Sequence, residues 1–223
     1  ELLVRGFHDS SAVAYSKTLL AQTRWAGFRF EALLGPTEAI RSCVKGAIDS
    51  LPVKYLRQVG KEKPGVLYES ATHLDAFAGD ECALIKGGGE TGLGVEAKFT
   101  SDIDTHTTYS MHRNQLIRNI EVGHSRFQDF YFLLVTPRAY RDRKSRLYSY
   151  KMDEYLGPNG AEALRKDALA PPSAADALRW QSNLGWLTWE DVVETVCPGG
   201  TPAFDHPNAG EFVAFLRDRR LLS

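Results

Sequence analysis

The stretch "GLGVEAKFT", residues 92–100, carries an acid and a base in a segment that otherwise reads as a buried β-strand. Side chains alternate between the two faces of a strand, so Glu96 and Lys98 share one face while Val95 and Ala97 share the other. Burying an unpaired ion on a sheet face is costly. We therefore expect Glu96 and Lys98 either to face solvent on an edge strand or to engage another charged group.

A second acidic residue upstream favours engagement with another charged group. The stretch "HLDAFAG", residues 73–79, also has the composition of a strand. Alternation predicts that Asp75 and Phe77 lie on one of its faces and Leu74 on the other. If the two strands pair, Asp75 and Glu96 converge on one divalent cation. Mg²⁺ is the expected ion, because it prefers carboxylate oxygens and keeps several waters.

An Asp followed, after 20 intervening residues, by Glu-x-Lys resembles the PD-(D/E)XK nuclease superfamily, also called restriction-endonuclease-like. The resemblance covers roughly residues 30–137. Leu74 stands where the family usually has a proline. The segment "RNQLIRN" adds support, because it places Gln115 and Asn119 on one helical face directly after the Glu-x-Lys strand. Many superfamily members carry a glutamine at this point, near the metal site.

The resemblance implies a metal-dependent nuclease that hydrolyses phosphodiester bonds. Asp75 and Glu96 would bind Mg²⁺, with Mn²⁺ as a substitute, and the backbone carbonyl of Ala97 would be a further ligand. Lys98 would orient or activate the attacking water and offset negative charge in the transition state. Gln115 would position that water or the Lys98 ammonium; otherwise it is an exposed helix amide.

Two further residues are candidates for the same site. Glu69 stands six positions before Asp75, as a glutamate does in a bacterial subgroup of the superfamily. It would be an outer carboxylate for a second metal ion or a residue that only ends a strand. Asn119 would reach the site from the helical face that it shares with Gln115.

Hydrophobic periodicity predicts an α/β protein whose elements run helix, three strands, helix and strand. The superfamily core has the same order, a mixed β-sheet flanked by helices. Gly123 is expected to end the second core helix. Helices are expected at residues 10–26, 38–48 and 112–122, and strands at residues 66–70, 73–79, 92–100 and 127–137.

Beyond Lys151 the pattern predicts only helices and loops. The segment "TWEDVVETV", residues 188–196, spaces Thr188 and Asp191 as in a capping box. We expect residues 1–150 to form the nuclease-like core with its N-terminal helices. Residues 151–223 would form a helical C-terminal extension packed on the same domain.

Composition indicates a protein of the cytoplasm. The 223 residues are 25% charged with a formal net charge of -1, so no global field attracts nucleic acid. Three cysteines lie far apart without a paired motif, which favours a reducing compartment over a disulfide framework. No apolar run approaches the length of a membrane span, so we expect a soluble protein and no membrane partner.

Local positive charge is concentrated in "PRAYRDRKSRLYSYK", residues 137–151. The segment is either a phosphate-binding strip, with Tyr140, Tyr148 or Tyr150 stacking on bases, or a solvated loop. The candidate nucleic-acid-binding cations are Arg138, Arg141, Arg143, Lys144 and Arg146.

Three functions stay open from the sequence. The first is a Mg²⁺-dependent deoxyribonuclease, expected to be an endonuclease and a homodimer if it cuts both strands of DNA. The second is a non-catalytic nucleic-acid-binding or assembly module with the same fold. The third is an interaction protein in which Glu96 and Lys98 form a surface ion pair. The sequence does not separate DNA from RNA, or endonucleolytic from exonucleolytic cutting.

Overall fold

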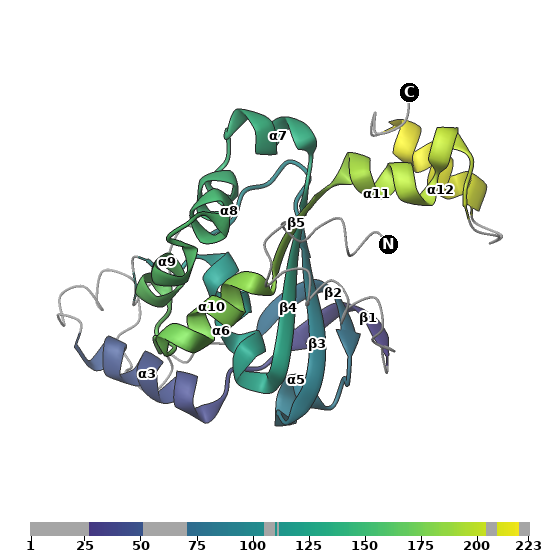
Figure 1. The fold of residues 1–223 in the computed structure, drawn as a ribbon. Helices are drawn as coiled ribbons and strands as arrows, with labels where there is room; N and C mark the ends of the chain where they lie inside the picture. The colour runs from purple at the N-terminus through teal and green to yellow at the C-terminus, as the bar shows by residue number, and fades with distance from the viewer. Residues whose placement is uncertain (1–26, 51–70, 105–109, 111, 204–208, 219–223) are drawn as a thin grey trace.

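The computed structural model describes residues 27–50, 71–104, 110, 112–203 and 209–218. These residues form an α/β fold in which helices flank a five-stranded mixed sheet (Figure 1). The strands are β1 (Phe28–Leu34), β2 (Thr72–Gly79), β3 (Gly89–Ala97), β4 (Phe127–Thr136) and β5 (Leu184–Thr188). The helices are α3 (Glu38–Asp49), α5 (Ala83–Lys86), α6 (Gln115–Arg126), α7 (Arg138–Arg143), α8 (Leu147–Leu156), α9 (Gly160–Asp167), α10 (Ala174–Ser182), α11 (Trp189–Val196), the 3₁₀ turn η2 (Pro198–Gly200) and α12 (Ala209–Asp218).

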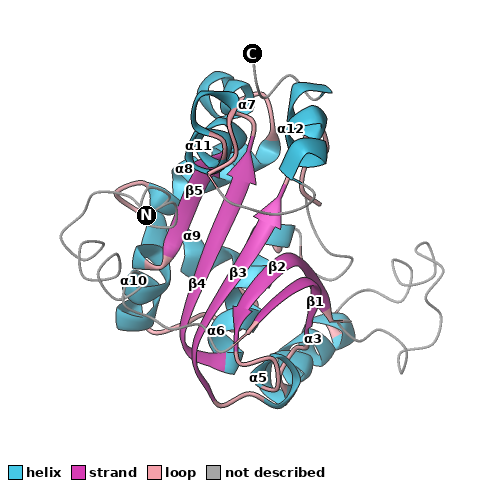
Figure 2. Ribbon diagram, turned by 90° about the vertical axis from the view of Figure 1, so that its right-hand side faces the viewer, coloured by secondary structure: helices cyan, strands magenta, loops and turns pink. Residues whose placement is uncertain are grey.

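The strands lie in the order β1-β2-β3-β4-β5 (Figure 2). The β2 strand runs antiparallel to both β1 and β3, whereas β3, β4 and β5 run parallel to one another. The carboxyl ends of β3, β4 and β5 therefore meet at one edge of the sheet. The amino end of β2 lies at the same edge, because β2 is antiparallel to β3.

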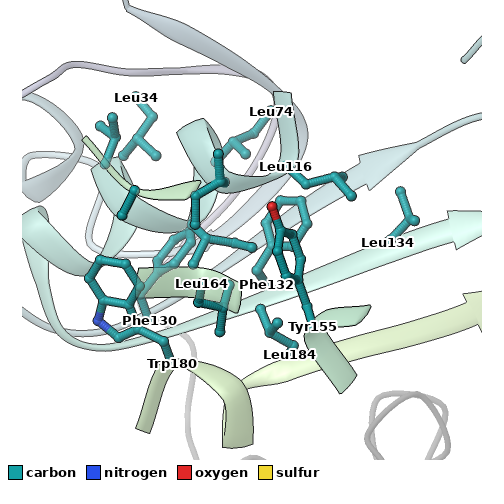
Figure 3. Close-up of a cluster of buried hydrophobic side chains, with 14 of the residues drawn as sticks. Leu34, Leu74, Leu116, Phe130, Phe132, Leu134, Tyr155, Leu164, Trp180 and Leu184 are labelled. Carbon is teal, nitrogen blue, oxygen red and sulfur yellow. The ribbon is translucent and has the colours of Figure 1, made fainter. Parts of the chain in front are cut away.

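The main apolar core lies between one face of the sheet and the helices α3, α6, α8, α9 and α10. Figure 3 shows part of this cluster, with Tyr155 of α8 beside Phe132 of β4 and Trp180 of α10 beside Phe130 of β4. Each large apolar side chain buried here contributes about 1.5–3 kcal/mol relative to its exposed state. This packing holds α6 against the sheet face from which Glu96 projects.

The α6 helix begins at Gln115, later than its predicted start at residue 112, and runs past its predicted end. Asn114 caps it, since its side-chain oxygen accepts the N–H groups of Leu116 and Ile117 at 2.9 and 3.1 Å. The expectation that Gly123 ends the helix is wrong, because α6 continues to Arg126. A Cβ atom at Gly123 would overlap the Phe130 ring. The glycine thus allows close packing of α6 on β4.

Two strands of the sheet were not predicted. The β5 strand is buried over all five of its residues, and a run this short shows no usable periodicity. The expectation of only helices and loops beyond Lys151 is therefore wrong, since residues 184–188 extend the sheet. The β1 strand, residues 28–34, forms one edge of the sheet. The predicted helix 10–26 and strand 66–70 lie outside the described residues.

The predicted capping box of α11 is confirmed. Thr188 Oγ1 accepts the Asp191 N–H at 3.1 Å, and the Asp191 carboxylate accepts the Thr188 N–H at 3.0 Å. The α11 and α12 helices pack on each other away from the main core (Figure 1). Among the described helices, none combines the length and apolar character that a bilayer crossing requires.

His124 is a half-buried titratable residue on α6 whose ring packs against side chains of this core. Its ring stacks on Trp180 with a centroid distance of 5.0 Å and meets Phe130 edge-on at 5.8 Å. Both ring nitrogens are buried and have no hydrogen-bond partner in the described part of the chain. Burial, reinforced by the charge of Arg179, holds the pKa of His124 well below its usual value of 6.5.

We predict that His124 makes the fold sensitive to acid. Below pH 6.5 the unfolded chain binds a proton on His124 that the folded chain does not bind. The free energy of unfolding should therefore fall by up to about 1.4 kcal/mol per pH unit from this group alone. Urea unfolding between pH 5 and pH 7.5 should show a smaller loss in His124→Phe than in the wild type. The exposed His73 provides the control variant, His73→Asn, and equal pH dependence in wild type and His124→Phe would contradict the prediction.

Candidate active site

Asp75 and Glu96 lie where the pairing of β2 with β3 ends. The last residues in register are Ala76 and Val95, and the next positions along the two strands are Asp75 and Glu96. There the Asp75 carboxylate accepts the Ala97 N–H at 2.6 Å. The Asp75 carboxylate thus accepts a β3 backbone N–H in place of a β2 carbonyl. This bond holds the carboxylate against the end of β3.

Side-chain alternation in β2 breaks next to Asp75. Alternation predicted Leu74 and Phe77 on opposite faces, but both pack in the main core, whereas Ala78 belongs to the cluster on the other face. Opposite the break, the ladder between β1 and β2 skips Glu31, which has a positive φ of 49°. Such irregularities re-aim side chains. This one allows Asp75 to lie between the strands while its neighbours stay in the core.

Glu96 is buried, and both of its carboxylate oxygens contact polar groups. Its exposure is 3%, and its Oε1 and Oε2 atoms accept the side-chain amides of Gln115 at 2.8 Å and Asn119 at 3.1 Å. The Lys98 ammonium lies 2.7 Å from Oε1. The expectation of a solvent-facing edge strand is therefore wrong, because β3 is the central strand of the sheet. A surface ion pair between Glu96 and Lys98 is excluded for the same reason.

Burial raises the pKa of Glu96 above its usual value of 4.5. The hydrogen bond and the charge of Lys98 oppose this rise in pKa, and the negative charge of Asp75 adds to it. Desolvation combined with a nearby like charge makes the ionised pair of carboxylates unfavourable. A bound cation would relieve both effects, and such perturbed carboxyl groups are common at functional sites.

Lys98 is held in place at its backbone as well as its ammonium. Its N–H donates to the Val135 carbonyl at 2.8 Å, and its carbonyl accepts the Trp189 indole N–H at 3.0 Å. The side chain is 12% exposed. Neighbouring Phe99 packs near the Trp189 ring, with centroids 6.5 Å apart. The β4 strand and the start of α11 therefore fix the ammonium beside Glu96.

The donor atoms at this edge fit a hard divalent cation bound largely by water. No three His, Cys, Asp or Glu side chains gather into a metal-binding cluster anywhere in the described ranges. The available donors are Asp75, Glu96 and the Ala97 carbonyl, which points to the same side as the Ala97 N–H that Asp75 accepts. Mg²⁺ commonly binds through one or two carboxylates and several waters, so this set is sufficient for it.

A hollow of about 400 Å³ borders the site on the side of Gln115. Thr72, His73, Asp104 and Arg118 also contribute to its lining. Its volume is in the range of small-ligand pockets. Because the Gln115 amide both lines the hollow and donates to Glu96, a molecule bound there would be separated from Glu96 by this one side chain.

The predicted basic segment forms α7 and α8 and is not a loop. Most of its cationic side chains already contact a carboxylate or an aromatic ring of this protein. These are Asp191 for Arg138 and Arg141, Asp153 for Lys144, and the Tyr140 ring for Arg146. Arg143 is exposed. Nucleic acid that bound this strip would therefore have to compete with these partners for most of its positive charge.

The tyrosines of this segment differ in their access to a base. Tyr148 is fully buried in the main core, so the expectation that it stacks on a base is wrong. Tyr150 is 59% exposed. Tyr140 is half-buried beneath the Arg146 guanidinium, whose carbon lies 4.7 Å from the ring centroid.

Thr72 is a site residue that sequence reasoning missed. Its hydroxyl donates to the side-chain oxygen of Asn119, whose amide donates to Glu96. The available signal was its position two residues before Leu74, which puts a polar side chain on the face turned toward the core. Glu69, the other upstream candidate, lies outside the described residues.

Comparison of the chain with known protein families, curated proteins and solved structures finds no match. The described residues themselves bring together Asp75, Glu96, Lys98, Gln115 and Asn119, all of which the sequence singled out. The functional evidence is therefore the geometry of this site.

Proposed function

We propose that this chain is a metal-dependent nuclease of the PD-(D/E)XK type, with a restriction-endonuclease-like core. The observation that supports this proposal best is the Asp75 carboxylate bonded to the Ala97 N–H at the end of β3, next to Glu96 and its Lys98 ion pair. A surface pair would not need a second carboxylate inserted between the strands. Two acids and one base held at a single sheet edge match the needs of phosphodiester hydrolysis.

Asp75, Glu96 and the Ala97 carbonyl would hold Mg²⁺, for which Mn²⁺ substitutes. When bound, this ion supplies a nucleophilic water at neutral pH and neutralises charge on the phosphoryl oxygens. Lys98 has donors only, so its ammonium can orient a water through the lone pairs of that water. It also offsets negative charge that develops on the phosphoryl group.

Gln115 would hold Glu96 in a fixed position relative to Lys98. Its amide donates to Glu96 Oε1, the oxygen that also accepts the Lys98 ammonium. Two donors on one oxygen fix the carboxylate plane and leave the Oε2 side for the metal. The hollow beside Gln115 would accommodate part of the nucleic acid strand next to the scissile phosphate. DNA is the expected substrate, and the cleavage assay below includes RNA as well.

Cleavage assays with Asp75→Asn test the proposal. The wild type should cut plasmid DNA, single-stranded DNA or RNA in Mg²⁺ or Mn²⁺, and EDTA should abolish the cutting. Asp75→Asn should cut at least about 100-fold more slowly, because a ligand of the catalytic ion is lost.

Asp129→Asn is the matched control, because Asp129 is a half-buried carboxyl on β4 toward the opposite end of the sheet, paired with Thr91. It should cut like the wild type. Absence of metal-dependent cutting on all three substrates, or an Asp75→Asn rate equal to that of the wild type, would overturn the nuclease proposal. The non-catalytic module with the same fold would then be the better account.

A further inference from the structure

A chain of hydrogen bonds links Glu96 to β2 through α6. The Thr72 hydroxyl donates to Asn119 Oδ1, and Asn119 Nδ2 donates to Glu96 Oε2 at 3.1 Å. Thr72 and Asn119 are buried, with exposures of 4% and 0%. Since the Thr72 donor occupies the amide oxygen, the NH₂ group of Asn119 must face the carboxylate.

The hydrogen bonds to Glu96 limit the lone pairs that its carboxylate can offer to a cation. A carboxylate has about four lone-pair positions. Gln115 and Lys98 occupy the two positions on Oε1, and Asn119 occupies one position on Oε2. One position on Oε2 is then left for a metal.

Asp75 is restricted in the same way, although less completely. Its Oδ2 atom accepts the Ala97 N–H, so Oδ1 is its less encumbered oxygen. Glu96 therefore offers one position on Oε2, and Asp75 offers its Oδ1 atom. Two such oxygens suit one ion that retains most of its waters.

We propose that Thr72 and Asn119 are positioning residues that orient Glu96 for a single divalent cation, so that each chain binds one ion. This inference rests on the proposed nuclease function, in which Glu96 is a metal ligand. Without the Thr72 hydroxyl, the buried Asn119 oxygen loses its donor, and only the bond to Glu96 then orients the amide. The amide must shift to find another donor for its oxygen, so Glu96 Oε2 is held less firmly.

Mn²⁺ titration by calorimetry tests this positioning role in the intact protein. Thr72→Val is compared with Thr72→Ser. The wild type and Thr72→Ser, which keeps the hydroxyl, should each bind one Mn²⁺ per chain. Thr72→Val should bind Mn²⁺ about 10- to 100-fold more weakly, as is typical when a partner of a metal ligand is lost. If Thr72→Val fails to fold, as judged by circular dichroism, Asn119→Ala breaks the same chain of bonds and should show the same loss.

Thr136→Val separates positioning from simple loss of a buried hydroxyl. Thr136 is fully buried on β4 and accepts the Trp186 indole N–H at 2.9 Å, with no bond to Glu96 or Asp75. Its removal should leave the Mn²⁺ affinity unchanged, even if the variant is less stable.

The possible outcomes distinguish this inference from the proposed function. Two Mn²⁺ ions per wild-type chain, or equal affinity in Thr72→Val and wild type, would overturn the positioning role of Thr72 and Asn119. If the wild type still cut nucleic acid in a metal-dependent way, the nuclease proposal would stand. No Mn²⁺ binding and no cutting by the wild type would overturn both. We expect one ion per chain, with weaker binding only in Thr72→Val and Asn119→Ala.

Discussion

Lys98→Met is expected to slow phosphodiester cleavage by about 10²- to 10³-fold without unfolding the protein. The substitution keeps the length of the side chain and removes the ammonium that lies 2.7 Å from Glu96. The backbone of residue 98 should stay in place, because Val135 and Trp189 bind it through its own N–H and carbonyl. The chemical step should therefore lose a donor to the water and to the phosphoryl oxygens while the fold is retained.

Single-turnover cleavage at saturating Mg²⁺ measures this effect separately from product release. Lys86→Met provides the control, because it makes the same substitution at an exposed position on α5. Its cleavage rate should equal that of the wild type. If Lys98→Met cleaved as fast as Lys86→Met, Lys98 would have no part in the chemistry.

The largest effect on stability is expected from Arg113→Met. Arg113 and Glu121 form an ion pair with side-chain exposures of 0% and 2%, and the Glu121 carboxylate also accepts the Ala170 N–H at 2.6 Å. Removing the guanidinium leaves a buried carboxylate without its cation. Breaking a buried pair in this way typically costs about 3–5 kcal/mol. Urea unfolding at neutral pH should show a loss of this size.

The double variant Arg113→Met/Glu121→Leu tests the cause of that loss. Removing both charges also removes the uncompensated carboxylate, so the double variant should be more stable than Arg113→Met alone. It should not fully reach the wild type, because the Ala170 N–H loses its acceptor. A loss of less than about 1 kcal/mol in Arg113→Met, within the range of exposed pairs, would show that this pair matters little.

The central part of the site could be predicted because it depends on local periodicity. The two-residue period places Glu96 on the same side as Lys98, which directly follows the end of β3 at Ala97, and the structure pairs them. The helical period places Gln115 and Asn119 on one face of α6, and both amides donate to Glu96. These contacts follow from spacing within one strand and one helix, once the helix packs on the sheet.

The remaining features depend on contacts between distant segments, which local patterns do not contain. The edge strand β1 and the five-residue β5 became part of the sheet only through pairing with β2 and β4. The break in alternation near Asp75 lies opposite Glu31, a residue of the neighbouring strand with a positive φ. The cations of α7 looked available for nucleic acid because Asp191, which binds Arg138, lies far along the sequence.

The most direct test of the account is Mn²⁺ binding by the wild type and by Asp75→Asn, measured side by side with Asp129→Asn. The central claim is that Asp75 and Glu96 hold a divalent cation beside Lys98. We predict saturable binding of Mn²⁺ to the wild type and to Asp129→Asn, and no detectable binding to Asp75→Asn. Absence of binding to the wild type, or equal binding to Asp75→Asn, would contradict the claim.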